Sequence, residues 1–281
     1  MKAVADTLQV ARSNLAERAA RGRRTRPPYC KAGDPELLAA IRVLVDERPT
    51  YGYRRLTVLL NRQREALGLP RINHKRVYRL SRRHGLLLER HSGRRPGRVH
   101  DGKIVVMRSN LRWCSDAFEI ACWNGATVRV GFVLDAHDRE AIAWVAVAGR
   151  GLSGSDVRDL MLDAVEKRFG AERAPHPIEW LSDNGSPYTA AETRDFAGQL
   201  NLAPCFTPVR SPESNGLAEA FIRTFKRDYV RINPLPDGDG VLRQLDGWFE
   251  DYNDNHPHSR LGMRSPREFI RAHPPTAACP V

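Results

Sequence analysis

Residues 111–136, LRWCSDAFEIACWNGATVRVGFVLDA, decide the fold, because they hold two strand-like runs joined by a tight turn. Both runs are rich in β-branched, aromatic and other apolar residues, which favour strands. Asn124-Gly125 between them is a strong hairpin signal, since both residues tolerate the positive φ angles of a two-residue turn. A third run of the same type, at 140–149, follows a short polar turn. The region therefore predicts three consecutive antiparallel strands.

Helical and strand-like patterns alternate after these three strands. They are, in order, a helix ending at Gly170, a strand at 177–182, a helix at 190–200, a short strand at 203–208 and a helix from about 212 to 230. This βββ-α-β-α-β-α order is that of the ribonuclease H-like fold, an α/β architecture. In that order the first and fourth strands lie side by side at the centre of the sheet, so an acidic residue on each can meet.

Charge is unevenly distributed along the chain. Residues 1–100 contain 24 Lys and Arg against 8 Asp and Glu, a net charge of +16, whereas residues 101–281 contain 21 against 25, a net charge of −4. A basic segment beside a mildly acidic body is typical of a protein that binds a polyanion, and nucleic acid is the expected one. A basic surface without a ligand is the alternative.

Cysteine and histidine usage argues against disulfides and zinc. The chain has five cysteines and no Cys-x-x-Cys pair, at Cys30, Cys114, Cys122, Cys205 and Cys279. His256 and His258 are separated by Pro257, and we assign them to a turn. No apolar run reaches the roughly 18 residues of a membrane span, and no signal-peptide core is present. The sequence predicts a reduced, cytoplasmic protein with no membrane partner.

Two helical regions are expected before the strands. Residues 1–28 are interpreted as a helix-turn-helix remnant, because Ala5, Leu8 and Leu15 have helical spacing. Residues 34–88 are interpreted as a helical DNA-binding domain whose first helix begins at Asp34.

The last helix of this domain is the most informative. Asn73 can cap it, and Val77 and Leu80 face inward. Five basic residues cover its outer surface, at Lys75, Arg76, Arg79, Arg82 and Arg83. Three helices with so basic a last member resemble a major-groove reader of DNA; the alternative is a solvated charged helix. The remaining predicted regions are a linker at 89–108, a catalytic core at 109–232 and a C-terminal helical extension at 233–281.

Three carboxylates are candidates for a shared site. Asp116 lies on the first strand, and Asp183 ends the fourth, where Asn184 and Gly185 shape a turn. The long helix offers two glutamates. Glu219 borders the apolar side of that helix, whereas Glu213 lies at its frayed start, so Glu219 is the better candidate.

Converging carboxylates repel one another unless cations lie between them. Oxygen ligands without histidine or cysteine favour magnesium or manganese over zinc, and we expect two ions. Two such ions activate a water or 3′-hydroxyl and stabilise the leaving oxygen when a phosphodiester is broken.

The segments WCSDAFE, WLSDNGSPY and SPESNGLAEAFIRTFKRDYV, with 35 residues between Asp183 and Glu219, resemble the catalytic core of retroviral-integrase-like DDE transposases. The resemblance is strongest to the second-frame transposase of bacterial insertion sequences with two overlapping frames. YNDNHPHSRLGMRSPREFI resembles the tail after that core, and TYGYRRLTVLLNR with INHKRVYRLSRRHGLLL resembles the helical segment before it. The likeness covers roughly residues 35–272.

The resemblance implies DNA strand cleavage and strand transfer at the terminal inverted repeats of a mobile element. By position, Asp116, Asp183 and Glu219 are then the metal ligands, and Lys226 contacts the terminal DNA. Expected partners are the element ends, target DNA, further copies of the chain and the first-frame product. Two rival functions are a catalytically idle DNA-binding regulator and a nuclease for RNA–DNA hybrids.

Overall fold

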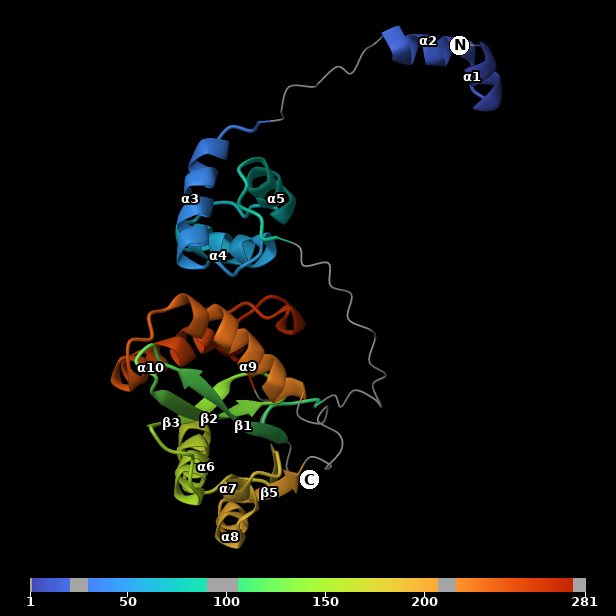
Figure 1. Ribbon diagram of the computed structural model, residues 1–281. Helices are drawn as coiled ribbons and strands as arrows, with labels where there is room; N and C mark the ends of the chain where they lie inside the picture. The colour runs from blue at the N-terminus through green and yellow to red at the C-terminus, as the bar shows by residue number, and fades with distance from the viewer. Residues whose placement is uncertain (1, 21–29, 90–105, 207–215, 275–281) are drawn as a thin grey trace. The chain divides into compact units, whose positions relative to one another are not determined.

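The structure is a computed structural model that describes residues 2–20, 30–89, 106–206 and 216–274 (Figure 1). These residues belong to two compact units, Met1–Ala40 and Ile41–Val281. The predicted linker at 89–108 lies largely outside the described residues, as does Glu213.

The first unit contains two short helices, α1 (Lys2–Thr7) and α2 (Arg12–Ala20), and the start of α3 (Asp34–Glu47). Ala5 is buried, whereas Leu8, at the next predicted inward position, is exposed. The helices therefore form where the spacing predicts them, with little apolar burial to support them.

Helices α4 (Tyr53–Ala66) and α5 (His74–Arg83) open the second unit together with the end of α3. The Asn61 side chain holds the connection between α4 and α5, because it donates to the Ile72 carbonyl and accepts from the Ile72 N–H. Asn73 caps α5 as predicted, accepting from the Lys75 N–H at 2.9 Å. Val77 and Leu80 are buried, which leaves the basic residues of α5 on its other sides.

The second unit is built on a five-stranded sheet with the order β3-β2-β1-β4-β5. The strands are β1 (Arg112–Ala121), β2 (Thr127–Asp135), β3 (Ala141–Ala148), β4 (Ile178–Ser182) and β5 (Leu202–Phe206). Strands β1, β2 and β3 are antiparallel, whereas β4 pairs in parallel with both β1 and β5. Gly125 has a φ of +84° in the β1–β2 turn. The predicted ribonuclease H-like order, with the first and fourth strands adjacent, is confirmed.

Helices cover both faces of the sheet (Figure 1). On one face, α6 (Gly154–Phe169) and α8 (Ala191–Gln199) bury Trp113 and Trp180. On the other face, α9 (Gly216–Asp228) and α10 (Gly238–Asn255) bury an aromatic cluster. Its rings pack closely, with centroid distances of 4.5 Å for Phe132–Phe221 and for Phe225–Phe249. Burial on both faces holds β1 and β4 rigidly in place.

Edge strand β5 contains a proline. Pro204 pairs with Trp180 of β4, and Pro204 has no backbone N–H to offer. A proline is tolerated in a sheet at an edge strand, which is where β5 lies.

The structure adds elements that the sequence patterns did not resolve. A short helix, α7 (Ser186–Thr189), follows Asp183 directly. A 3-10 turn, η2 (Val230–Ile232), follows α9, and the C-terminal extension contains α10, a second 3-10 turn, η3 (Ser259–Leu261), and α11 (Pro266–Ala272). Within the described residues, no helix is both long and apolar enough to span a membrane.

Candidate active site

Strands β1 and β4 bring the first two candidate carboxylates to neighbouring positions. The parallel register pairs Arg112 with Glu179 and Cys114 with Leu181. Asp116 lies two residues beyond the last pair on β1, and Asp183 lies two residues beyond it, directly after β4, so both follow the paired segment at the same offset. Neighbouring parallel strands are roughly 4.8 Å apart, so residues in register meet at the same level of the sheet.

The turn after β4 presents Asp183 at the surface. Ser182, the last residue of the strand, is fully buried, whereas Asp183 is exposed. The Asp183 carboxylate accepts a hydrogen bond from the Gly185 N–H at 3.0 Å. A Cβ at position 185 would lie 3.0 Å from the same Asp183 Oδ1, a tight contact that would force the carboxylate to shift by a few tenths of an ångström. Gly185 therefore leaves room for this carboxylate, and Asn184 beside it is exposed.

The pKa of Asp116 is affected by both of the other carboxylates. Its pKa is raised to about 6, chiefly by burial, and the negative charges of Asp183 and Glu219 raise it further. A hydrogen bond from the Ala117 N–H to the Asp116 carboxylate, at 2.7 Å, acts in the opposite direction. Charge effects in water fall off within about 10 Å, so Asp183 and Glu219 act on Asp116 from nearby.

Helix α9 supplies the third carboxylate and a nearby cation. Glu219 is exposed in the first turn of α9, next to buried Ala218. Lys226 follows two turns later, and its ammonium lies 5.6 Å from the centre of the Phe118 ring on β1. Lys226 thus lies against the strand that carries Asp116.

The three carboxylates do not form a finished metal centre. Across the described ranges 2–20, 30–89, 106–206 and 216–274, no three His, Cys, Asp or Glu side chains lie close enough together to hold a metal ion. The negative charges of Asp183 and Glu219 both act on Asp116. Their oxygen donors are of the type that Mg²⁺ and Mn²⁺ prefer.

A buried hydroxyl pair beside these acids was not anticipated from the sequence. Ser115 on β1 and Tyr188 on α7 share a hydrogen bond of 3.0 Å, and both side chains are buried. Burial raises the pKa of Tyr188, so its hydroxyl stays protonated. The bond joins the neighbour of Asp116 to the helix that follows Asp183.

The predicted DNA-binding residues lie on α5, at some distance in sequence from the acids. Lys75, Arg82 and Arg83 are exposed, and Arg76 and Arg79 are partly buried. The helix carries no acidic residue, so its accessible surface is strongly basic.

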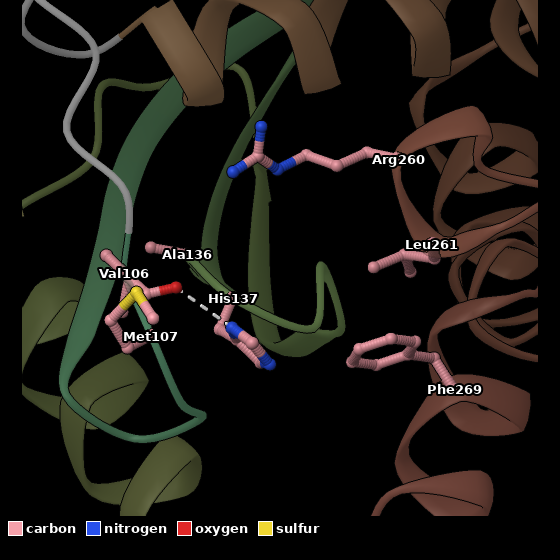
Figure 2. A pocket seen from close by; sticks show the side chains of 7 residues that line it. All are labelled: Val106, Met107, Ala136, His137, Arg260, Leu261 and Phe269. Carbon is pink, nitrogen blue, oxygen red and sulfur yellow. Dashed lines mark hydrogen bonds between the residues drawn. The ribbon is translucent and has the colours of Figure 1, made fainter.

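A pocket of about 390 Å³ lies elsewhere on the core (Figure 2). Arg260, Leu261 and Phe269 of the C-terminal extension face Met107 and His137 across it (Figure 2). The His137 ring bonds to the Val106 carbonyl at 2.9 Å. Ala136 also lines the pocket, and its N–H donates to the Arg112 carbonyl at the start of β1.

Three family models match the chain. One integrase core domain model matches residues 107–212, and a second matches residues 201–266. An HTH-like domain model matches residues 33–94. These matches cover the helical region with α4 and α5, the sheet, and part of the C-terminal extension.

Similar curated proteins come from insertion elements. Transposase InsD for insertion element IS2A/D/F/H/I/K of Escherichia coli is 52% identical over 251 residues, which are 89% of this chain and 82% of that protein. An uncharacterized protein of insertion element IS136 from Agrobacterium fabrum is 67% identical over 189 residues, which are 67% of this chain and 97% of that protein.

Solved structures show weaker likeness. A chain of the simian T-cell lymphotropic virus intasome is 17% identical with a TM-score of 0.47, and the match covers 86% of this chain and 79% of that one. The Mos1 transposase catalytic domain is 19% identical with a TM-score of 0.42, covering 50% and 71%. The family assignment therefore rests on the family models and on the insertion-element relatives. The chain belongs to the insertion-element transposases that carry an integrase core, a family of polynucleotidyl transferases.

Proposed function

We propose that this transposase cuts and joins DNA at the ends of its element in a reaction that depends on a divalent metal ion. The observation that carries the proposal is the parallel pairing of β1, which holds Asp116, with β4, which Asp183 follows directly, in a chain of the insertion-element transposase family. A carboxylate cluster that repels itself gains most from a bound cation. The exposed positions of Asp183 and Glu219 leave the cluster open to a large substrate.

Asp116, Asp183 and Glu219 would hold Mg²⁺ or Mn²⁺, and we expect two ions. When bound, the metal lowers the pKa of the attacking water or 3′-hydroxyl and stabilises the leaving oxygen. Gly185 positions the Asp183 carboxylate through its N–H. Neutralising either aspartate would therefore remove a ligand without removing the fold of the turn.

The basic residues divide the DNA contacts between them. Lys226 lies beside β1, where it would bind a phosphate of the terminal DNA. The α5 residues Lys75, Arg76, Arg79, Arg82 and Arg83 would bind the duplex through its major groove and phosphates. The substrates would be the terminal inverted repeats and target DNA. Several copies of the chain, together with the first-frame product, would assemble on them.

Labelled element ends incubated with the full chain and Mg²⁺ test the proposal. We expect nicking that frees a 3′-hydroxyl, followed by joining of that end to target DNA. The Asp116→Asn variant should bind the same DNA and do neither. Binding without cleavage by the wild-type chain would instead show a regulator, and cleavage of RNA–DNA hybrids alone would show a nuclease.

A further inference from the structure

A polar interface crosses the second compact unit, Ile41–Val281. One side is formed by the segment between α3 and α4 and by the start of α4, and the other by α9, α10 and the residue after α10. We call its six central residues the latch: Arg48, Tyr51 and Arg55 on one side, and Asp228, Asp251 and His256 on the other.

The centre of the latch is a bond between two buried rings. The Tyr51 hydroxyl and His256 Nδ1 share a hydrogen bond of 2.9 Å, and the rings meet edge to face at 5.5 Å. Tyr51 is 3% exposed and His256 is fully buried. A buried polar group without a partner is costly, so each side chain stabilises the other only when the two surfaces meet in this orientation.

Two arginines close the latch on either side of Tyr51. Arg48 donates to both oxygens of Asp251 at 2.6 Å, a bidentate pair. Arg55 donates to the buried Asp228 carboxylate at 3.1 Å. The Arg48 and Arg55 guanidinium groups also lie 5.8 Å and 5.2 Å from the centre of the Tyr51 ring, which adds a cation–π attraction.

The core side of the latch is held in place by its own contacts. The Tyr229 hydroxyl donates to Asp251 at 2.9 Å, and Arg227 donates to both oxygens of Asp228 at 2.6 Å. The carboxylates therefore keep their orientation when the helical side is altered. Arg62 extends the interface by donating to the Asn255 carbonyl at 2.7 Å and to the Glu268 carboxylate.

The interface is polar, which determines what it can do. The aromatic core clusters on the two faces of the sheet contain no residue of 41–89 among their described members. Bidentate ion pairs and buried hydrogen bonds demand a defined geometry, and they separate without opening an apolar core. Such a contact sets orientation rather than supplying most of the stability.

We infer that the latch fixes the DNA-binding helix α5 relative to Asp116, Asp183 and Glu219 of the same chain. DNA held by α5 would then be presented to the active site of that same copy. The inference relies on the proposed function for its consequence in catalysis, whereas closure of the latch can be measured without any reaction.

Hydrogen–deuterium exchange on the full chain measures closure. Arg48→Glu and Asp251→Arg should each speed amide exchange about tenfold at the start of α4 and the end of α10, because a repelling pair replaces the bidentate one. Exchange in β1 should not change, and it reports whether the core is folded. If Asp251→Arg folds poorly, Arg48→Ala can replace it, because this change affects only the helical side of the latch. Arg48→Ala should also speed exchange at the start of α4 and the end of α10.

Arg42→Glu is the matched control. Arg42 is exposed on α3, the helix that ends just before Arg48, and no ion pair to Arg42 is found among the described residues. It makes the same change in charge and should leave exchange in α4 and α10 as in the wild type. The double variant Arg48→Glu/Asp251→Arg in one chain restores an opposite-charge pair and should recover most of the protection.

Strand transfer by mixed proteins decides whether the latch closes within one copy. Each single variant should lose about tenfold in strand transfer from pre-cleaved ends, and the double variant should recover. An equimolar mixture of the two single variants should not recover if the pair forms within one chain. Recovery by the mixture equal to that of the double variant would overturn the inference and show an interface between copies.

Two further results would also overturn the inference. One is unchanged amide exchange in all the single variants, and the other is a double variant whose amides exchange as fast as those of the single variants. The Asp116→Asn variant separates this inference from the proposed function. It should keep wild-type exchange in α4 and α10 while losing activity. If the wild-type chain showed no strand transfer, the proposed function would fail, and the exchange measurements would still decide whether the latch closes.

Discussion

The Ser115 hydroxyl lies 3.0 Å from the Tyr188 hydroxyl, and this bond joins the two backbone segments that carry Asp116 and Asp183. Ser115 precedes Asp116 on β1, and Tyr188 is the third residue of the short helix after the Asp183 turn. The pair therefore acts as a cross-brace for carboxylates that repel one another.

Removing the Tyr188 hydroxyl should loosen this brace. We expect Tyr188→Phe to lower the free energy of unfolding by about 1 kcal/mol, because the ring still fills its site and one buried hydrogen bond is lost. The Mg²⁺ concentration for half-maximal cleavage should rise several-fold. Tyr53→Phe is the control, since the Tyr53 hydroxyl bonds only to exposed Arg54 among the described residues. An unchanged Mg²⁺ requirement in Tyr188→Phe would show that the brace has no effect on the acids.

Asp116→Asn should stabilise the protein without metal and inactivate it with metal. The pKa of Asp116 in the folded protein, about 6, lies above its ordinary 3.8, so the ionised carboxylate destabilises the fold at pH 7. The neutral amide should raise the free energy of unfolding by about 1 to 3 kcal/mol. Chemical denaturation with EDTA measures this gain, and strand transfer with Mg²⁺ should fall by several orders of magnitude. A less stable Asp116→Asn would contradict the electrostatic argument.

Substitution of Glu219 and of Glu213 should have different effects on activity. Glu219→Gln should abolish cleavage and strand transfer, because Glu219 shares the region of Asp116. Glu213→Gln should leave substantial activity, because Glu219 and not Glu213 is proposed as the third metal ligand. Strand transfer from pre-cleaved ends compares them. Activity in Glu219→Gln with none in Glu213→Gln would reassign the ligand.

Stability should fall in acid because His258 is held uncharged. Burial lowers the pKa of His258 to about 3, and the nearby charges of Arg55 and Arg139 contribute. The unfolded chain takes up this proton below its ordinary pKa of 6.5, whereas the folded protein does not until about 3. Stability is therefore fully present above 6.5 and declines below it. Between pH 6 and 4, wild type should lose about 1.4 kcal/mol per pH unit more than His258→Asn. Equal slopes in urea titrations would contradict the shift.

Salt dependence should identify the phosphate contacts of α5. If five basic residues neutralise about five phosphates, log affinity against log salt should have a slope of about −4 to −5. Lys75→Ala should reduce that slope by about 0.9 on any duplex sequence. Arg42→Ala, exposed on α3, should leave it unchanged. Identical slopes in the wild type and Lys75→Ala would exclude this residue from the DNA contacts.

The sheet could be predicted because its signals are local. Asn124-Gly125 marks the hairpin, and the order of strands and helices then determines that β1 and β4 are neighbours. That strand order alone places Asp116, on β1, and Asp183, directly after β4, on neighbouring segments of the sheet. Helix α10 also has a local signal in the sequence, because its buried apolar residues recur at helical spacing. They are Val241, Leu245, Trp248, Phe249 and Tyr252.

Contacts between distant polar residues could not be predicted. Ser115 and Tyr188 are 73 residues apart, and Tyr51 and His256 are 205 apart. Neither serine nor tyrosine follows a periodic pattern that reveals its partner. His256 caps the C-terminal end of α10, and nothing in the residues around it predicts its burial against Tyr51. Helix α7 was missed because four residues containing a proline look like part of a turn.

Pro204 has a consequence for how copies of this chain associate. An exposed strand edge with a full row of N–H groups would template another strand and promote fibrils. Edge strand β5 lacks one of those donors, which interrupts any continuous ladder along it. Crowding of several copies on one DNA duplex therefore need not lead to intermolecular sheets at this edge.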